Sequence, residues 1–448
     1  MGKAQQDLTT GSLWKKILLF SIPLMLSNVL QVLFNMADVA VVGRFAGSYA
    51  LGSVGSTTIL VAMFTGFLIG VSSGINVLVA RYLGAKDKRG TEETVHSAAI
   101  LSFLIGLVLM ILGISFTRFI LGLMNTKAEL IEGAVLYLRI YLLGMPALGI
   151  YNFGNAVFSA AGNTKKPLVY LAISGVVNVI LNLFFVIVCG MSVAGVALAS
   201  IISQYLSAVM VMAALIRSKE IYAVRVSKLR LEKNRARAII RIGIPAGMQN
   251  AIFQIANLFI QTGVNSFSAT MVSGNSAAAN ADALVYDVMA AFYTACGSFM
   301  SQNYGARKKE RVLKSFFISV VYSFGIGMTM GVLLVVFGEQ FLSLFTGEPA
   351  VIEAGMKRLT IMGLSYGVSA FMDAPIAASR ALGKSVAPTV IVIMGSCVFR
   401  IIWVNTIFAY FKTIPSLYML YVFSWTITAT AELIYLKKIY KEQMALIG

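Results

Sequence analysis

The sequence predicts an all-α integral membrane protein whose twelve transmembrane helices form two six-helix bundles related by an internal parallel repeat. Three observations predict this fold: an apolar composition, a series of long apolar stretches, and a second half that resembles the first. Of the 448 residues, 58% are hydrophobic and only 12% are charged, whereas a soluble domain is about 45–50% apolar and about 25% charged. A spanning helix uses about 20 apolar residues, so the chain could supply roughly a dozen spans.

The apolar residues gather into twelve long stretches, several of which are long enough to tilt or to protrude from the bilayer. They fall at residues 14–42, 49–80, 93–117, 131–158, 167–188, 193–216, 238–266, 276–302, 313–337, 351–379, 386–410 and 415–436. Glycines recur every four residues in two of them, at Gly66, Gly70 and Gly74 and at Gly243 and Gly247. This spacing predicts close packing between helices.

The charged residues predict the topology. The chain has 36 Lys and Arg against 18 Asp and Glu, a net charge of +18. If the N-terminus is cytoplasmic, 28 of the 36 basic residues fall on the cytoplasmic side, four fall outside and four lie within helices. Cytoplasmic loops are rich in Lys and Arg, so this division predicts twelve spans with both termini in the cytoplasm. The positive charge then reports topology, and we expect no nucleic-acid partner.

One long polar connection divides the chain, and the halves on either side repeat each other. We expect an N-terminal lobe at 1–216, a basic cytoplasmic linker at 217–236 and a C-terminal lobe at 237–448. An offset of 222 residues aligns Pro23 with Pro245, and Asn35 with Asn257. Six helices thus recur in the same order and, being even in number, in the same orientation. Such parallel repeats in transporters place a substrate cavity between the halves.

Polar side chains recur at helical spacing inside several apolar stretches. They are Asn28, Gln31, Asn35 and Asp38 in the first stretch, Asn250, Gln254, Asn257 and Gln261 in the seventh, Ser174, Asn178 and Asn182 in the fifth, and Ser365, Ser369 and Asp373 in the tenth. Buried amides can simply hydrogen-bond a neighbouring helix. Because the stripe recurs in both halves, we favour the lining of a water-filled cavity.

Carboxylates inside spans are the sharper signal, because a charge at a helix centre costs about 2.5–3.5 kcal/mol on insertion scales. Five lie in predicted spans: Asp38, Asp282, Asp287, Asp373 and Glu432. Arg380 and Arg400 could pair with Asp373 or Glu432 as a structural feature. Asp38 has no basic residue nearby in its own helix, since Arg44 lies almost two turns further on. We therefore expect a functional role for Asp38 above all.

The sequence argues against an enzyme and against a resident cofactor. A single histidine, His96, leaves no His-based metal site, and the three cysteines lie in or beside apolar runs, where a disulfide framework is not expected. Gly383-Lys384-Ser385 resembles the end of a phosphate-binding loop, but Ala378 occupies the position of its first glycine.

Three segments carry a specific family resemblance. They are the first-helix pattern from Ile22-Pro23 to FNMADVAVVGRFAG, AANADALVYDVMAAFYTACGSFMSQNYGA in the eighth helix and GVALASIISQ in the sixth. Together they resemble the multidrug and toxic compound extrusion (MATE) family over essentially the whole chain. The resemblance implies a V-shaped bacterial transporter with a central cavity, which exports amphipathic, often cationic compounds in exchange for H⁺ or Na⁺.

The resemblance also implies site residues. Asp38 and Asn178 match the first-helix Asp and fifth-helix Asn of the family's N-terminal cation site, and Ser200 sits where a sixth-helix hydroxyl would be. Two departures stand out: Asn182 occupies a position where many relatives have Asp, and Phe253 occupies one where some have Glu. The ion-coupling residues that we expect are Asp38, Asn35, Asn178, Asn182 and Ser200, with Na⁺ as a candidate ligand of Asp38, Asn178 and Asn182. The substrate-binding residues that we expect are Gln31, Gln254, Asn257, Asp282, Asp287 and Asp373.

The remaining expectations concern partners and rival functions. We expect a monomer in the bacterial inner membrane, with amphipathic small molecules and the lipid bilayer as its partners. The nearest alternative is a flippase of lipids or lipid-linked precursors, which would need basic cavity residues for anionic headgroups. A membrane-embedded enzyme would need a paired-Asp metal motif or a His/Asp couple, and neither is present. A channel is a third alternative, although the unequal repeat positions Asp38 and Ile260 suit alternating access better.

Overall fold

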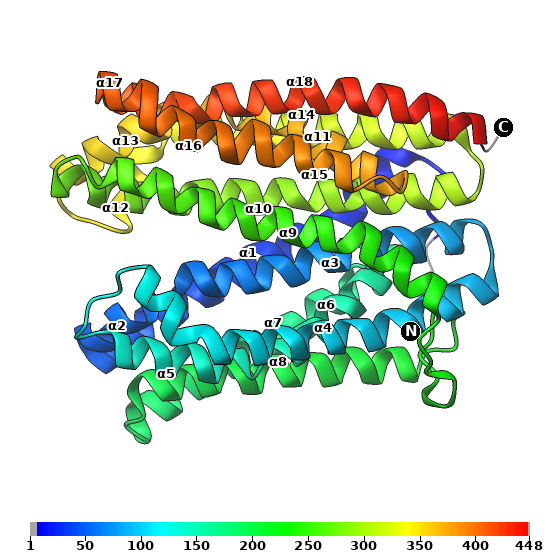
Figure 1. The fold of residues 1–448 in the computed structure, drawn as a ribbon, viewed down its shortest axis with the longest axis horizontal. Coiled ribbons are helices and arrows are strands. Elements are labelled where there is room, and N and C mark those ends of the chain that lie inside the picture. The colour runs from blue at the N-terminus through cyan, green and yellow to red at the C-terminus, as the bar shows by residue number, and fades with distance from the viewer. Residues whose placement is uncertain (1–6, 447–448) are drawn as a thin grey trace. The chain divides into compact units, whose positions relative to one another are not determined.

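A computed structural model describes residues 7–446, and every regular element in that range is helical. Nine helices in it are long and apolar enough to cross a membrane, or up to eleven when each of two bent pairs counts as one span. The nine are Leu13–Gly55, Thr58–Gly84, Lys88–Leu123, Lys165–Val188, Ser192–Ile216, Ala269–Gly305, Lys309–Val336, Val386–Phe411 and Ile414–Leu446. Helix α9 (Lys233–Val264), with 32 residues, is the predicted seventh helix and completes a set of twelve (Figure 1).

Two spans are bent at equivalent places in the repeat. Helix α5 (Ile131–Leu142) meets α6 (Met145–Ala160) at 47°, and α13 (Pro349–Gly363) meets α14 (Tyr366–Ala381) at 49°. Pro146 lies in the first turn of α6, where its missing N–H costs nothing because the helix has no acceptor for that group. The sequence predicted one continuous stretch in each case, because both halves of each bent span are apolar.

The second predicted stretch, 49–80, is divided in the structure. Helix α1 (Leu13–Val41) continues through the π-helical segment η1 (Val42–Ala46) into α2 (Gly47–Gly55), and α3 (Thr58–Gly84) begins after a break at Ser56 and Thr57. The other spans are α4 (Lys88–Leu123), α7 (Lys165–Leu183) with η2 (Phe184–Val188), α8 (Ser192–Ile216), α10 (Ala269–Gly305) and α11 (Lys309–Val336). The last two are α15 (Val386–Val392) continued by η4, α16, η5 and α17 to Phe411, and α18 (Ile414–Leu446).

The chain forms two compact units, and two helices contribute to both. Of the described residues, unit 1 contains Asp7 and residues 26–251, and unit 2 contains residues 8–25 and 252–446. The start of α1 therefore packs in unit 2, where Phe20 meets Phe299 edge to face at 5.4 Å. The start of α9 packs in unit 1. The lobe boundaries predicted from the sequence stay a prediction, and the contacts divide the chain within α1 and α9 and not at the linker.

The glycine steps bring α3 and α9 into backbone contact within unit 1. A Cβ atom on Gly70 would lie 2.4 Å from the Gly247 nitrogen, and one on Gly74 would lie 2.7 Å from the Gly243 nitrogen. Real Cβ atoms do not approach this closely, so a side chain at either position would separate the helices. The close packing that the glycine spacing predicted is confirmed.

Candidate functional site

Helices α1 and α7 bring together a carboxylate and two amides in unit 1. Asn182 Nδ2 donates to Asp38 Oδ1 and, at 3.3 Å, to Asn178 Oδ1. Asn178 and Asn182 are one helical turn apart on α7, and both are buried. Asn182 Oδ1 is also buried and has no hydrogen-bond partner among the described residues. The group therefore offers a carboxylate and an unused amide oxygen inside a membrane span.

The local packing explains why these groups meet. One turn before Asn178, Gly175 leaves room for the ring of Phe34, which lies one turn before Asp38. A Cβ atom on Gly175 would lie 1.9 Å from Phe34 Cε2. Both helices turn π-helical just beyond the site, α1 at Val42 and α7 at Phe184. Such π-helical turns occur frequently at functional sites.

Two tyrosines that the sequence did not suggest lie beside this group. Tyr137 and Tyr141 on α5 stack with ring centroids 5.9 Å apart, and both are within electrostatic range of Asp38. Gln204 on α8 lies within hydrogen-bond reach of the Tyr141 hydroxyl. The i, i+4 spacing of the tyrosines was a visible signal, but such a pair is more often part of an apolar core. Tyr137 does in fact also pack in a cluster with Val41, Val186 and Val196.

Other predicted residues are less closely tied to this group. Ser200 is buried on α8, and its hydroxyl donates to the Val196 carbonyl of its own helix at 3.1 Å. Asn35 and Gln31 are exposed on α1. In unit 2, Gln254 is partly buried and Asn257 is exposed on α9. Their predicted roles in ion coupling or substrate binding stay predictions.

Asp282 on α10 belongs to a buried, fully partnered cluster in unit 2. Arg358 on α13 forms an ion pair with Asp282 Oδ2, with its Nε 3.1 Å away, and the Tyr366 hydroxyl donates to Asp282 Oδ1. Arg358 also donates to Asn275 Oδ1, which accepts a second bond from Tyr418 at 2.7 Å. This arrangement favours a structural role for Asp282, and its predicted contact with substrate stays a prediction.

The other carboxylates of unit 2 differ in their burial and in the charged groups that surround them. Asp373 on α14 is partly buried and lies in the field of Arg380 and Arg400. Glu432 on α18 is fully buried and interacts with Arg380 and Asp373. Arg400 donates from Nε to Ser424 Oγ at 3.0 Å and lies over the Tyr421 ring. Asp287 is partly buried on α10, five residues beyond Asp282.

The electrostatic surroundings of Asp38 differ from those of three other intramembrane carboxylates. Asp282, Asp373 and Glu432 each face at least one arginine, whereas Asp38 interacts with the Asn182 amide and with no cation among the described residues. A buried charge is stable only when it is paired or solvated, or when it coordinates a metal ion. The oxygens around Asp38 can therefore receive a proton or a small cation.

The fold and this group define an integral membrane protein with a duplicated six-span half and a lone carboxylate within one span. Comparison with known families identifies it further. The sequence profile of the MatE family matches residues 23–184 and again residues 245–406, and the two matches are offset by the same 222 residues as the repeat. The chain therefore belongs to the MatE family, whose members are transporters and not enzymes.

Individual relatives agree with this. "Probable multidrug resistance protein YpnP" of Bacillus subtilis is 28% identical over 380 residues, which cover 84% of this chain and 85% of that protein. The "FAD transporter" of Shewanella oneidensis is 22% identical and covers 82% of this chain and 81% of its own. A solved MOP superfamily transporter from Pyrococcus furiosus has a TM-score of 0.91 at 20% identity and covers 99% of both chains, which shows the shared fold.

Proposed function

We propose that this transporter exports amphipathic, often cationic small molecules from the bacterial cytoplasm in exchange for H⁺ or Na⁺, and that Asp38 is the ion-responsive group. The observation that carries the proposal is the isolation of Asp38 inside a span, hydrogen-bonded to Asn182 and without a cationic partner among the described residues. Intramembrane ionisable residues are costly and mark ion pathways in transporters.

The site chemistry suits a proton or Na⁺. A proton on Asp38 removes the charge of this partly buried group, while Na⁺ compensates the charge and binds oxygen ligands. Asn182 Oδ1, buried and unpartnered among the described residues, and Asn178 Oδ1, on the same face of α7, supply such oxygens. Binding or release of a proton or Na⁺ changes the net charge at Asp38. It therefore changes the relative stability of conformations in which Asp38 is buried to different extents. A potential of 100 mV contributes about 2.3 kcal/mol per charge moved, a factor of roughly fifty.

The substrate class is inferred from the relatives and from the charged groups of unit 2. Curated relatives named as multidrug resistance proteins cover more than four fifths of the chain, and carboxylates at Asp287 and Asp373 could attract cations. A lipid or lipid-precursor flippase would need free cationic groups for anionic headgroups. Arg358 is already paired with Asp282, and Arg400 is held against Ser424 and an aromatic ring. The export of cationic compounds is therefore the better supported function.

We infer the orientation from the distribution of charge. The positive-inside rule favours cytoplasmic termini and a cytoplasmic linker in the bacterial inner membrane. We propose a monomer with a lobe on either side of residues 217–236.

The test is efflux of a cationic dye from proteoliposomes under separately imposed pH and Na⁺ gradients. Wild type should respond to at least one gradient, and Asp38→Asn should lose that response because an amide neither binds a proton in this range nor compensates a cation. Glu339→Gln, which also converts a carboxylate to an amide but at an exposed position on α12 (Gly338–Ser343), is the matched control and should behave as wild type. Undiminished ion-driven efflux by Asp38→Asn would rule out the role of Asp38, and efflux by wild type that ignores both gradients would support the flippase.

A further inference from the structure

The connection between α8 and α9 is folded against unit 1. Tyr222, Ala223 and Val224 are buried, and the Tyr222 ring meets Phe158 edge to face at 6.2 Å. The Val224 N–H donates to the Leu215 carbonyl at 3.2 Å, and the Arg225 guanidinium donates to the Ile216 and Ser218 carbonyls. The first half of the connection is therefore a fixed part of the fold.

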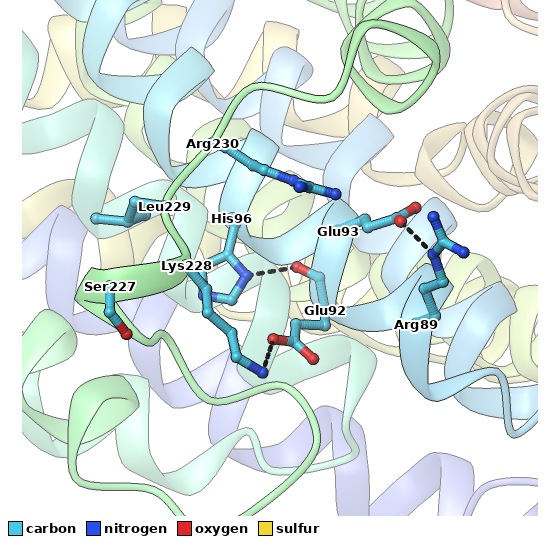
Figure 2. A pocket seen from close by; sticks show the side chains of 8 residues that line it. All are labelled: Arg89, Glu92, Glu93, His96, Ser227, Lys228, Leu229 and Arg230. Carbon is cyan, nitrogen blue, oxygen red and sulfur yellow. Dashed lines mark hydrogen bonds and ion pairs between the residues drawn. The ribbon is translucent and has the colours of Figure 1, made fainter.

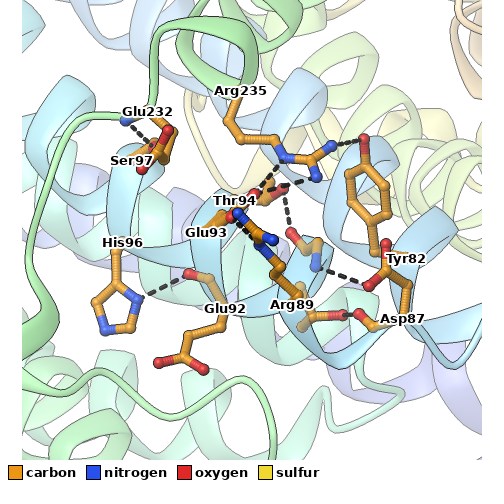
Figure 3. Close-up of polar contacts among 12 residues, drawn as sticks. Tyr82, Asp87, Arg89, Glu92, Glu93, Thr94, His96, Ser97, Glu232 and Arg235 are labelled. Carbon is orange, nitrogen blue, oxygen red and sulfur yellow. Dashed lines mark hydrogen bonds and ion pairs between the residues drawn. The ribbon is translucent and has the colours of Figure 1, made fainter.

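Two consecutive residues of α4 then hold the chain at two points. His96 Nε2 accepts the Arg225 N–H at 2.9 Å, while its Nδ1 lies 2.7 Å from the Glu92 carbonyl (Figure 3). Because that carbonyl can only accept, Nδ1 carries the proton and Nε2 is free to accept. Ser97 Oγ accepts the Glu232 N–H at 3.0 Å. The anchors lie seven residues apart on the linker and adjacent on α4.

Between the anchors, the chain displays aliphatic and cationic side chains to its surroundings. We call residues 226–231 the linker strip. Within it, Val226, Leu229 and Leu231 are exposed by 65%, 38% and 48%, and the side chains of Lys228 and Arg230 are also exposed. In a segment that met only water, three exposed aliphatic residues within six would be costly. Their exposure at an anchored position indicates a partner with both apolar and anionic character.

The cationic side chains of the strip can leave their present ion pairs and bind such a partner. Lys228 pairs with Glu92 at 2.6 Å and Arg230 pairs with Glu232 at 2.5 Å, but all four side chains keep access to solvent. Exposed pairs of this kind contribute little to stability, so an incoming anion can compete for the cations. A hollow of about 440 Å³ lies between the strip and α4, and Arg89, Lys228 and Arg230 are among the residues that line it (Figure 2).

Both ends of the strip lie close in sequence to a membrane span. It begins ten residues after the end of span α8 and ends two residues before the start of α9. Residues 217–241 contain nine Lys and Arg but only two Glu. Clusters of basic residues immediately beside a transmembrane helix attract anionic lipids, and neighbouring aliphatic side chains strengthen such contacts by entering the interface.

We propose that the linker strip is a docking surface for anionic phospholipids in the leaflet on its own side of the membrane. Lys228 and Arg230 contact headgroup phosphates, Val226, Leu229 and Leu231 enter the interfacial region, and His96 and Ser97 hold the strip in the required position. This surface is separate from the ion-coupling group, and its existence does not depend on which substrate is exported.

The experiment uses the full chain in lipid nanodiscs. An environment-sensitive fluorophore is attached at Ser227→Cys in a Cys189→Ser background, because Cys189 is exposed while Cys296 and Cys397 are buried. Emission should shift to shorter wavelength in nanodiscs that contain anionic phospholipid and not in purely zwitterionic ones. Quenching by brominated lipids in mixed bilayers then gives the preference of the site for anionic over zwitterionic lipid.

Removal of the positive charges of the strip should change its lipid preference, whereas removal of its anchor on α4 should change its mobility. At about 1 kcal/mol per basic residue, Lys228→Gln with Arg230→Gln should lower the preference for anionic lipid by roughly 30-fold. The matched pair Lys437→Gln and Lys438→Gln, exposed at the end of α18, should leave it unchanged. His96→Ala should raise the mobility of the label, measured by fluorescence anisotropy, because the Arg225 N–H loses its acceptor.

Three outcomes would overturn the proposal. Equal emission in anionic and zwitterionic nanodiscs would show no lipid selectivity. A label that remains in water in every bilayer would show that the strip does not reach the interface. A shift that depends on the number of protein copies per nanodisc, and not on lipid charge, would identify a second copy of the chain as the occupant.

Discussion

Replacement of Asp282 distinguishes a structural carboxylate from one that binds substrate. In Asp282→Asn, Arg358 keeps its charge in a buried site, where it is 6% exposed, and loses the carboxylate that its Nε contacts at 3.1 Å. Removal of one partner from a buried ion pair costs about 3–5 kcal/mol, because the other charge is left uncompensated. The Tyr366 hydroxyl also loses a charged acceptor.

The expected result is a large loss of thermal stability. For a unit of about 200 residues, 1 kcal/mol corresponds to about 2–4 °C in melting temperature, so Asp282→Asn should melt roughly 10 °C below wild type. Melting is followed by intrinsic fluorescence in detergent. The double variant Asp282→Leu with Arg358→Met removes both charges and should recover most of the loss, because apolar replacement of a whole buried pair is often neutral.

The same variants test the alternative that the sequence suggested. If Asp282 contacts substrate, Asp282→Asn should melt close to wild type while the KM for a cationic dye rises several-fold. That combination would refute the structural interpretation. Glu339→Gln, at the exposed position on α12, is the comparison variant, and its melting temperature should stay within about 2 °C of wild type because exposed surface substitutions usually change stability by less than about 0.5 kcal/mol.

Two further predictions concern packing and pH. Gly70→Ala should lower the melting temperature, because its Cβ would lie 2.4 Å from the Gly247 backbone and overpacking costs about 1–3 kcal/mol. The control is Gly325→Ala in α11, whose Cβ meets nothing within 4 Å and which should instead gain up to about 1 kcal/mol of helix propensity. Equal effects of the two substitutions on the melting temperature would contradict the close approach of α3 and α9. Burial raises the pKa of Tyr222 from 10.0 to about 12, so the neutral phenol favours the docked linker below pH 10 and this contribution is lost as the pH rises from about 10 to about 12. Hydrogen exchange of residues 222–224, corrected for intrinsic rates, should accelerate over that range in wild type, and an identical profile in Tyr222→Phe would show that Tyr222 is not the group responsible.

The fold was predictable because bilayer physics constrains it strongly. Spans must be long and apolar, so composition and stretch length were enough to find twelve of them, and the 222-residue offset recurs in the two MatE matches. The bends within two spans were not predictable from apolarity alone. The break between α5 and α6 depends on backbone geometry around Gly144 and Pro146, which an apolar stretch does not reveal.

The site was predictable only where residues share a helix or match a family pattern. The period of α7 predicts that Asn178 and Asn182 share a face, and the family resemblance associated Asn178 with Asp38. Asn182 contacts both residues, while the role of all three in ion coupling stays a prediction. The partnership of Asp282 with Arg358 joins residues 76 positions apart, and spacing carries no information on such a pair. The same holds for His96 and Arg225, which are 129 positions apart.

The sharing of α1 and α9 between the units has a consequence for how the chain can be divided into fragments. Each half begins with a helix whose first turns belong to the other unit, at residues 8–25 in one case and up to residue 251 in the other. A cut within the linker would therefore leave each fragment without one helical segment of its own unit and with one segment that belongs to the other unit. We expect the two fragments, expressed separately, to fold poorly and to regain transport only when they are produced together.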